Sequence, residues 1–423
     1  MLKDISYKDY RRSSDIHGSV LYPAVMVAPV QNDILVDLSK QNTIKRILDP
    51  FHGSGTALYE SHLVFPEAEI LGCDINPFAN LITKTKLTGV AANIEDDIDR
   101  ISYLLERDHS DSIYEFPNRE KWFRDDIAIS LTRIKNAIHN IATPENRLFF
   151  WCMMSDVVRR YSNSRSSTYK LHAKPQKKID EMPNGTITDF LCSIKSNYHQ
   201  YEAVHCKNFK LVKQDALLYL PQFKLSNKVD ILITSPPYGD NQTTVPYGLF
   251  SSLALRWIDP DDLDLEGWEL DNYSVIDSHS LGSRAKPFSL DSFQQELLEP
   301  FTRDISEHKA KKVYTFFYDF YKFLDLATEI TDKYIVMTIG NRTVDRIKID
   351  MAQIAANYLQ EKGFIEHQTV SREILNKRTP PLTSKVNDAP VESMSKEYVL
   401  IYKKQHKATQ NLTKKVGVSI STQ

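Results

Sequence analysis

The feature that most limits how this chain can fold is a short apolar run, 229–233, that ends abruptly in a proline-rich loop. The run Val-Asp-Ile-Leu-Ile has the length of a buried β-strand. The loop that follows, Thr-Ser-Pro-Pro-Tyr-Gly-Asp at 234–240, contains prolines and a glycine that punctuate local structure. Open α/β sheets place their functional groups at the carboxyl ends of their strands. The pattern therefore predicts an α/β protein with polar chemistry in this loop.

The residue types in the loop suit a planar amine. Proline lacks an N–H group and has a fixed φ, so the carbonyls of this loop are available as acceptors, and Ser235 and Tyr238 add a hydroxyl and an aromatic face. An aromatic amine is a poor nucleophile because its lone pair is delocalised into the ring. Two acceptors that bind both N–H groups turn that lone pair out of conjugation, and no strong base is required. A purely structural proline-rich turn is the alternative for these four letters.

A second strand end lies at 45–60, where an apolar run leads into Asp-Pro-Phe-His-Gly-Ser-Gly-Thr at 49–56. Its two glycines permit close approach to the backbone, and a helix that starts near Thr56 directs its first N–H groups at an anion. A tight turn without a ligand is the alternative. The run 69–77 predicts another strand, which ends in Asp74. An acid at that place binds ribose hydroxyls or, alternatively, caps the helix that follows.

Together these motifs resemble those of the DNA amino-methyltransferases, whose serine form is associated with N4 of cytosine. In that family the exocyclic amine is held by the first side chain of the Ser-Pro-Pro-Tyr motif and by the carbonyl after it, here Ser235 and Pro236. Pro237 and Tyr238 complete the motif, and the tyrosine stacks on a base taken out of the duplex. The run 49–56 is similar to the first cofactor motif, which holds the methionine end of S-adenosylmethionine.

The resemblance assigns further residues to the cofactor. Those implied to bind S-adenosylmethionine are Asp49, Phe51, Gly53, Gly55, Thr56, Asp74, Asp215 and Tyr22. Asp215 follows a predicted strand at 209–212, where the family contacts the adenine; a loop acid or a helix cap is the alternative. Tyr22 belongs to a Tyr-Pro-Ala-x-Met run that lies over the cofactor in this family, and simple packing on the sheet edge is the alternative. No metal is predicted.

Residues 93–200 differ in character and predict a helical insertion, with apolar residues at helical spacing. Its later part is rich in bases interleaved with Tyr and Ser, which suits phosphate contacts, although such runs also form solvated loops. The residues predicted to bind DNA are Arg159, Arg160, Arg165, Lys170 and, in a basic stretch near the carboxyl end, Arg378. The acidic segment 259–277 has no Lys or Arg and predicts an exposed crossover that does not favour phosphate.

The predicted fold class is α/β, a Rossmann-like methyltransferase fold with a mostly parallel twisted sheet, helices on both faces and the helical insertion. The predicted parts are 1–92 (cofactor half), 93–200 (insertion), 201–404 (catalytic loop and late sheet) and 405–423 (flexible tail). The late part predicts a helix at 314–331, a strand at 333–339, a helix at 349–361 and strands near 364–371 and 398–402.

Composition limits the classes of protein. A chain of 423 residues with 41% hydrophobic content can bury one large core or two modest ones, and a net charge of −2 confines any nucleic-acid surface to a local patch. The four cysteines, Cys73, Cys152, Cys192 and Cys206, have no C-x-x-C spacing, so neither zinc nor disulfides are indicated and a reducing cytoplasm fits. No apolar stretch approaches the ~18 residues of a membrane span, which predicts a soluble protein.

The sequence thus predicts an S-adenosylmethionine-dependent DNA methyltransferase that forms N4-methylcytosine, with double-stranded DNA as its partner. A restriction-modification setting would add a cognate restriction endonuclease. N6 of adenine is the nearest alternative, because the same two acceptors hold either amine. An RNA guanine-N2 methyltransferase is the next, and a catalytically silent DNA-binding module is the alternative from another class. Methylation at cytosine C5 is disfavoured because no Cys lies in the loop to act as nucleophile.

Overall fold

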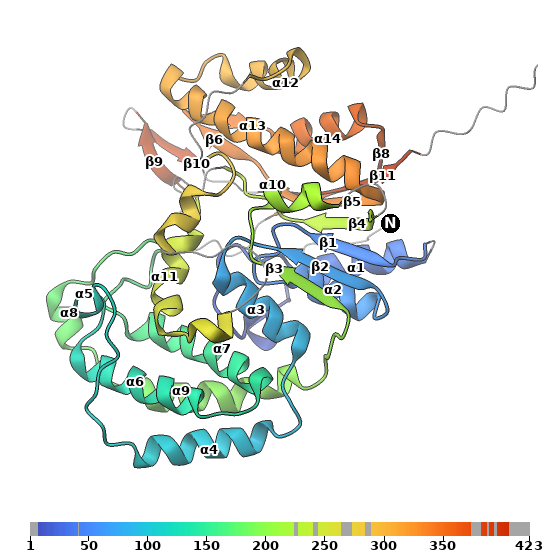
Figure 1. Cartoon of the computed structure of the whole chain (residues 1–423). Helices are drawn as coiled ribbons and strands as arrows, with labels where there is room; N and C mark the ends of the chain where they lie inside the picture. Colours follow the sequence, from blue (N-terminus) through green and yellow to red (C-terminus); the bar gives the residue numbers. More distant parts are fainter. Residues whose placement is uncertain are drawn as a thin grey trace, which may run out of the picture.

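The apolar runs of the sequence form the seven-stranded sheet at the centre of Figure 1. The computed structural model describes residues 7–40, 42–223, 227–239, 244–263, 273–283, 289–373, 382–386, 389–392 and 396–405. In spatial order the strands are β3 (Phe209–Val212), β2 (Glu69–Cys73), β1 (Arg46–Asp49), β4 (Val229–Thr234), β5 (Thr331–Gly340), β11 (Lys396–Lys404) and β8 (Phe364–Glu373). The first five are mutually parallel, whereas β11 runs antiparallel to both of its neighbours.

Helices cover both faces of this sheet because alternate strand residues point to opposite sides. Leu48 and Leu232 belong to one core, with residues of α10 (Ala216–Tyr219), α12 (Ser292–Thr302), α13 (Glu307–Ile330) and α14 (Met351–Glu361). Their neighbours Ile47 and Ile231 belong to another core, with residues of α1 (Ala28–Ser39) and α2 (Thr56–Val64). Figure 1 shows α13 and α14 on one side of the strands and α1 and α2 on the other. The predicted Rossmann-like fold is confirmed.

The order of the strands creates a switch point between β1 and β4. From β1 the chain moves outward to β2 and β3, and it then returns to β4 on the opposite side of β1. In open α/β sheets, ligands bind outside the carboxyl ends of the strands at such a point. The loops that follow β1 and β4 therefore border the position where a ligand is expected.

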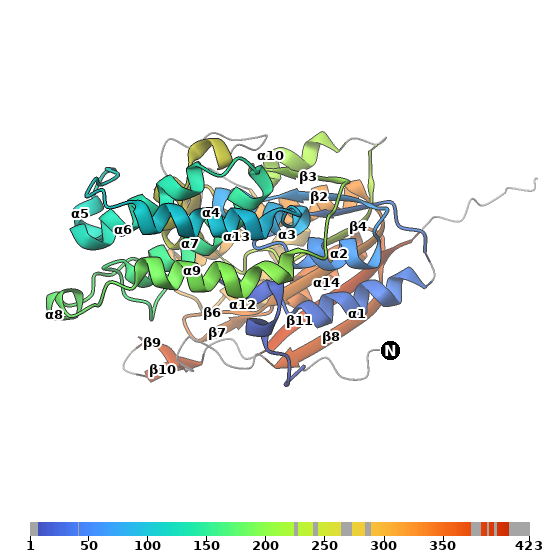
Figure 2. The ribbon, with the colours of Figure 1, turned by 90° about the horizontal axis from the view of Figure 1, so that it is seen from below.

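Residues 93–200 form a layer of helices beside the sheet, as Figure 2 shows. The helices are α4 (Ile94–Arg107), α5 (Arg119–Trp122), α6 (Asp125–His139), α7 (Pro144–Tyr161), α8 (Gln176–Asp180) and α9 (Thr186–Asn197). The buried residues of this layer share one core with α3 (Pro77–Thr88) and α11 (Tyr247–Trp257). In Figure 1, α11 lies to the left of the strands and runs toward α7 of this layer. The helices of this region thus pack directly on the cofactor half, and the proposed domain boundaries remain predictions.

The late elements match their predicted positions, with two differences. Helix α13 begins at Glu307, seven residues before the predicted start, and β5 follows it without a loop. The sequence also gave no signal for two short antiparallel pairs, β6 (Arg342–Val344) with β7 (Ile347–Ile349), and β9 (Leu382–Val386) with β10 (Ala389–Glu392). Short 3₁₀ turns lie at Arg12–Ser14, Ile16–Gly18, Tyr198–Tyr201, Leu220–Gln222, Pro260–Leu263 and Tyr273–Ser278.

The described ends of the acidic segment are partly buried: Leu263, Ile276 and Asp277 are buried, whereas Pro260 and Asp261 are exposed. The prediction of an exposed crossover is therefore wrong for the buried positions. The Asp262 carboxylate accepts hydrogen bonds from the Arg147 guanidinium at 2.6 Å and from the Trp151 indole at 2.7 Å. The buried Asp277 carboxylate accepts the first N–H groups of α11, those of Gly248 and Leu249, at 3.0 and 3.1 Å. Asp262 and Asp277 are therefore bonded within the protein, which the absence of nearby bases in the sequence concealed.

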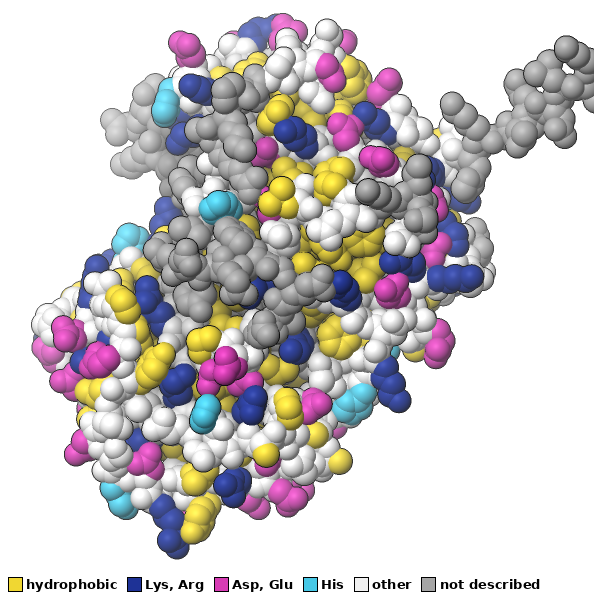
Figure 3. All heavy atoms as spheres, viewed as in Figure 1, with side chains coloured by type: hydrophobic (Ala, Val, Ile, Leu, Met, Phe, Trp, Pro, Cys, Tyr) yellow, Lys and Arg dark blue, Asp and Glu magenta, His cyan; other side chains and the backbone are white. Residues whose placement is uncertain are grey.

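Three general properties follow from the described part of the chain. It contains no helix that is long and apolar enough to cross a membrane. Its four cysteines are free, and within the described ranges no group of three His, Cys, Asp or Glu side chains is placed to hold a metal ion. On the face seen in Figure 3, Lys and Arg side chains are interspersed with Asp and Glu. Among the described residues on that face, the basic side chains form no continuous surface.

Candidate active site

The glycine loop at 49–56 and the catalytic loop at 235–239 begin next to each other. β1 pairs with β4 in parallel, with Leu48 opposite Leu232, so both strands end at the same edge of the sheet. The Thr234 hydroxyl donates a 2.6 Å hydrogen bond to the Asp49 carboxylate across the two strand ends. The two motifs that lie almost two hundred residues apart in sequence therefore share one site.

Polar side chains at the end of β2 and on α3 hold the glycine loop in place. Gly53 and Gly55 have φ values of +50° and +76°, in the left-handed region where a side chain is strained. A Cβ on Gly55 would also lie 2.6 Å from the Thr83 side chain. The Asp74 carboxylate accepts the N–H groups of Gly53 at 2.9 Å and of Asn76 at 2.8 Å. Asp74 thus fastens the loop to the end of β2, and Asn76, not Asp74, caps α3.

Two buried polar atoms of this loop have no hydrogen-bond partner among the described residues, namely Asp49 Oδ2 and Thr56 Oγ1. Burying polar groups without a partner is unfavourable, so these two oxygens have capacity for a further hydrogen bond. Burial also raises the pKa of the Asp49 carboxyl to about 7, against the opposing effect of its bonds from Thr234 and from the Phe51 N–H. Asp49 Oδ2 can therefore accept a further donor. Elsewhere in the loop, the Phe51 ring packs edge-on against Phe323, with ring centroids 5.0 Å apart.

The Tyr22 ring lies next to the glycine loop, and its predicted contact with a cofactor remains a prediction. A Cβ built on Gly53 would meet the Tyr22 ring at 3.5 Å and no other atom within 4 Å. The Tyr22 ring stacks on Tyr247 with centroids 5.8 Å apart, and it meets Phe250 edge-on at 6.1 Å. Its hydroxyl accepts a hydrogen bond from the Asn76 amide at 3.2 Å. This aromatic cluster connects the glycine loop to α11.

A buried charged cluster supports the other side of the glycine loop. The Lys86 ammonium donates to the Ser54 carbonyl at 2.8 Å and lies 3.3 Å from His17 Nδ1. His17 Nε2 lies 2.9 Å from the Glu60 carboxylate. Burial lowers the pKa of Lys86 to about 7 and raises that of Glu60 to about 7, while burial followed by the Lys86 charge holds the pKa of His17 well below its usual value. These groups position the loop backbone.

Asp215 follows β3 and caps a helix. Its side chain accepts the Leu217 N–H at the start of α10, at 2.8 Å, so the helix-cap alternative is realised. The backbone next to it is joined to the glycine-loop side, because the Gln214 N–H donates to the Asp74 carbonyl at 3.2 Å. Asp215 is therefore at the same edge of the sheet as Asp74, and a contact with a cofactor's adenine remains a prediction.

The catalytic loop is part of a hydrogen-bonded chain of side chains. The half-buried Ser235 hydroxyl lies 3.1 Å from the Tyr238 hydroxyl, which donates to the Glu397 carboxylate at 3.3 Å. Glu397, on β11, accepts a 2.7 Å bond from Arg372 on β8. Burial and then the Glu397 charge raise the pKa of Tyr238 well above its usual value. At Gly239, the last described residue of this stretch, a Cβ would lie 2.5 Å from the Arg342 guanidinium.

The predicted DNA-binding arginines of the insertion differ in their surroundings. The Arg159 guanidinium lies 4.3 Å from the centre of the Phe250 ring and donates to the Thr168 carbonyl at 2.7 Å. Arg160 forms an ion pair with Asp189 at 2.6 Å. Arg165 and Lys170 are exposed. Phe250 contacts both Arg159 and Tyr22, so the basic segment and the glycine loop are joined through α11. Arg378 lies outside the described residues.

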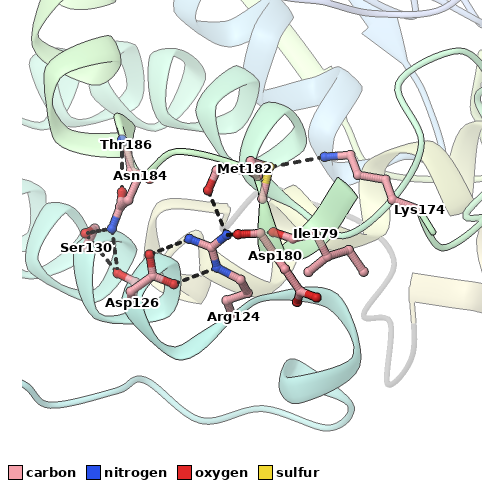
Figure 4. Close-up of polar contacts among 9 residues, drawn as sticks. All are labelled: Arg124, Asp126, Ser130, Lys174, Ile179, Asp180, Met182, Asn184 and Thr186. Atoms are coloured by element: carbon pink, nitrogen blue, oxygen red, sulfur yellow. Dashed lines mark hydrogen bonds and ion pairs between the residues drawn. The ribbon is translucent and has the colours of Figure 1, made fainter. Parts of the chain in front are cut away.

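Some bases of this region have structural roles, as Figure 4 shows. The Lys174 ammonium donates to the Ser162 carbonyl at 2.7 Å and to the Met182 sulfur at 3.3 Å, and burial lowers its pKa. Arg124 binds the Asp126 carboxylate and the carbonyls of Ile179 and Met182. These bonds attach α8 to α6. Basic composition alone therefore overstated the number of cations available to a phosphate.

Sequence reasoning missed several residues of the site. Asn76 was recognisable, because Asn followed by Pro is a frequent helix start. Lys86 and Thr83 stand among apolar residues of α3, where their spacing indicates only a helix. Glu397 and Arg372 lie on strands whose alternating pattern gives no sign that two charged residues face inward. These two carry no signal in the sequence.

The strand order, the glycine loop at the switch point and the helices on both faces define a Rossmann-like methyltransferase fold. No family model matches the chain. It is 28% identical over 419 residues to the Type II methyltransferase M.MvaI of Kocuria varians, and the matched region covers 92% of this chain and 90% of that protein. The similarity therefore extends across both loops and the helical layer.

Proposed function

We propose that this chain is an S-adenosylmethionine-dependent DNA methyltransferase that modifies the N4 amine of cytosine. The observation that carries the proposal is the shared edge of the two loops, where Thr234 binds Asp49 and brings the Ser235 loop beside the glycine loop. Similarity to a Type II methyltransferase along nearly the whole chain supports the same class of activity.

The residues at the glycine loop fit the proposed cofactor. S-adenosylmethionine supplies an electrophilic methyl group on a sulfonium. The partnerless oxygens of Asp49 and Thr56 are suited to polar groups at its methionine end, and the absence of a side chain on Gly53 leaves space below Tyr22. Asp74 and Asp215 stand at the ends of the two next strands, where acids bind ribose and base donors. Phe51 completes the cofactor residues that we propose.

At the catalytic loop, Ser235 and the Pro236 carbonyl would accept the two N–H bonds of the amine. This arrangement turns the nitrogen lone pair toward the methyl donor and holds the reacting atoms in position. Pro237 adds no N–H donor, and the Tyr238 ring is proposed to stack on the extruded base. We favour cytosine because serine occupies the first position of the motif. N6 of adenine is the alternative, because the same two acceptors also fit that amine.

The DNA surface proposed here is the segment that contains Arg159, Arg160, Arg165 and Lys170. It is the basic part of the insertion, and it is joined to the site through Phe250. Cations of this kind contact phosphates and place a duplex without reading its sequence. In a restriction-modification system the same DNA site would be cut by a paired endonuclease when it is unmethylated.

The deciding experiment is methylation of genomic DNA with S-adenosylmethionine, followed by digestion and mass spectrometry of the nucleosides. We expect N4-methylcytosine from the wild-type protein and, in the same reaction time, about 100- to 1000-fold less from the S235A variant. If N6-methyladenine is found instead, the target of the enzyme is the N6 amine of adenine and the proposal of cytosine is wrong. Methylated RNA with unmodified DNA would favour the guanine-N2 alternative. DNA binding without cofactor binding or methylation would favour a catalytically silent module.

A further inference from the structure

The chain of side chains behind Ser235 joins the catalytic loop to the far strands of the sheet. It runs from the Ser235 hydroxyl through the Tyr238 hydroxyl to the Glu397 carboxylate, over distances of 3.1 and 3.3 Å. Arg372 closes it with a 2.7 Å bond to the other carboxylate oxygen. Glu397 and Arg372 are mostly buried, with side chains 12% and 10% exposed. Two charged residues are thus placed inside the fold beside the reacting loop.

The chemistry of these groups fixes the direction of every bond in the chain. An ionised carboxylate only accepts, and a guanidinium only donates. Tyr238 must therefore donate its hydrogen to Glu397. Burial and the Glu397 charge raise the pKa of Tyr238 well above its usual value, so the phenol keeps that hydrogen. With its only hydrogen directed at Glu397, the Tyr238 oxygen can bond to Ser235 only as an acceptor.

The hydrogen of Ser235 is consequently directed at Tyr238, and the lone pairs of its oxygen remain for other donors. A serine without such a constraint rotates freely and acts as a donor or an acceptor. An amine presents N–H groups, so it requires acceptors and is repelled by a hydroxyl hydrogen. Hydrogen bonds in a chain polarise one another, which makes the Ser235 oxygen a better acceptor when the chain ends in a carboxylate.

We propose that Glu397 and Arg372 are positioning residues that set the Ser235 hydroxyl as a hydrogen-bond acceptor for the amine of the target base. Glu397 sets the direction of the chain, and Arg372 holds the carboxylate in place. Neither residue touches the substrate. The inference rests on the proposed function, because it assigns the acceptor role to the same Ser235, and it names a requirement that the Ser-Pro-Pro-Tyr motif alone does not supply.

The direct test is the E397Q variant, whose side chain has nearly the same shape. Arg372 only donates, so it selects the amide oxygen of Gln and leaves the NH₂ group facing Tyr238. The chain then reverses, Tyr238 donates to Ser235, and the serine hydrogen is released toward the amine. We expect kcat for DNA methylation to fall roughly tenfold or more, the effect of one lost hydrogen bond. The Kd for labelled S-adenosylmethionine should stay within error of wild type, whereas the melting temperature should fall, because Arg372 loses its charged partner.

A second substitution distinguishes this role from a structural one. In the R372M/E397Q double variant no guanidinium fixes the Gln amide, which can turn its oxygen toward Tyr238 and restore the original direction. We expect the double variant to have a higher kcat than E397Q. The R372M single variant is the matched control and should not exceed wild type. If the two residues had only a structural role, the kcat of the double variant would be equal to or lower than that of E397Q.

The outcomes separate this inference from the proposed function. Methylation by E397Q at the wild-type kcat, or a double variant no better than E397Q, would overturn the positioning role while DNA methylation by the wild type stands. If E397Q does not fold, Y238F gives the same information, because it removes the hydroxyl link and keeps the ring: a wild-type kcat in Y238F overturns the inference. A wild-type protein that methylates no DNA would overturn the proposed function and this inference with it.

Discussion

The two loops of the site occupy neighbouring strand ends, yet they are held in different ways. The glycine loop is fixed through its backbone by residues close in sequence, such as Asp74, which is 21 residues from Gly53. The catalytic loop is fixed through its side chains by distant residues, such as Glu397, which is 159 residues from Tyr238. Because the backbone of the glycine loop is bonded to residues nearby in sequence, its conformation is fixed. The side chains of the catalytic loop are bonded to residues distant in sequence, which can orient them without changing the loop backbone.

This contrast predicts that substitutions in the two loops have separable effects. In the glycine loop, a substitution should affect folding and cofactor binding together, because the loop backbone is part of the buried structure. In the catalytic loop, a substitution should affect methyl transfer with little effect on either. A catalytic-loop variant that loses cofactor binding or stability, or a glycine-loop variant that loses only methyl transfer, would contradict this distinction.

The largest effect is expected for S235A. It removes the hydroxyl acceptor while the Pro236 carbonyl remains. Loss of one such preorganised group lowers kcat by about 100- to 1000-fold, or about 3 to 4 kcal/mol in the transition state. Steady-state methylation, labelled-cofactor binding and thermal unfolding should show this loss with unchanged cofactor Kd and stability. S102A is a matched control, because the Ser102 hydroxyl donates to the Ile98 carbonyl within its own helix. Weakened cofactor binding in S235A would contradict the separation.

The next largest effect is expected for Asp49, where the two loops meet, and it should appear in the pH dependence of stability. The Asp49 carboxyl is fully buried, and its pKa of about 7 is above the value of about 3.9 in an unfolded chain. A raised pKa stabilises the fold below pH 4, and this contribution is lost as the pH rises through 7. In D49N the dependence is absent. Between pH 4 and 7 the free energy of unfolding of the wild type should therefore fall by roughly 3 kcal/mol relative to D49N.

Denaturant unfolding at several pH values measures this difference. Above pH 7 the two curves should run parallel. A wild-type stability that rises relative to D49N between pH 4 and 7 would show that Asp49 is ionised in the folded protein at low pH, and that a partner for Oδ2 is present in solution.

A smaller effect on stability is expected for alanine substitutions at two glycines, one in the glycine loop and one outside it as a control. Gly55 and Gly363 both have positive φ, +76° and +83°, so alanine strains either backbone by roughly 1 to 2 kcal/mol. A Cβ at Gly363 meets nothing within 4 Å, whereas one at Gly55 meets Thr83 at 2.6 Å. G55A should therefore be the less stable variant by thermal unfolding and should also lose cofactor binding, while G363A should keep it. Equal cofactor affinity in both variants would contradict the role given to Gly55.

The same contrast explains what the sequence could predict. The glycine loop was predictable because its requirements are local: strand, Gly53, Gly55 and the helix at Thr56 follow one another, and Asp74 ends the next strand. The Ser235 loop was predictable from its prolines. Its supports were not, because Glu397 and Arg372 come together only through β11 and β8, and nothing in either strand records the register that places them opposite each other. Asp262 was misjudged for the same reason, since its partner Arg147 is 115 residues away in sequence.

The smallest effect is expected for Y22F, which separates the ring of Tyr22 from its hydroxyl. The hydroxyl accepts a 3.2 Å bond from the Asn76 amide, but the same amide also donates to Ser251 at 2.8 Å and so keeps a partner. Loss of one such bond should cost about 0.5 to 1.5 kcal/mol of stability in thermal unfolding. Because the ring above Gly53 is retained, cofactor Kd should change little in Y22F and rise clearly in Y22A. A large rise in Kd for Y22F would mean that the hydroxyl, held by Asn76, contributes to the cofactor side of the site as directly as the backbone of the glycine loop does.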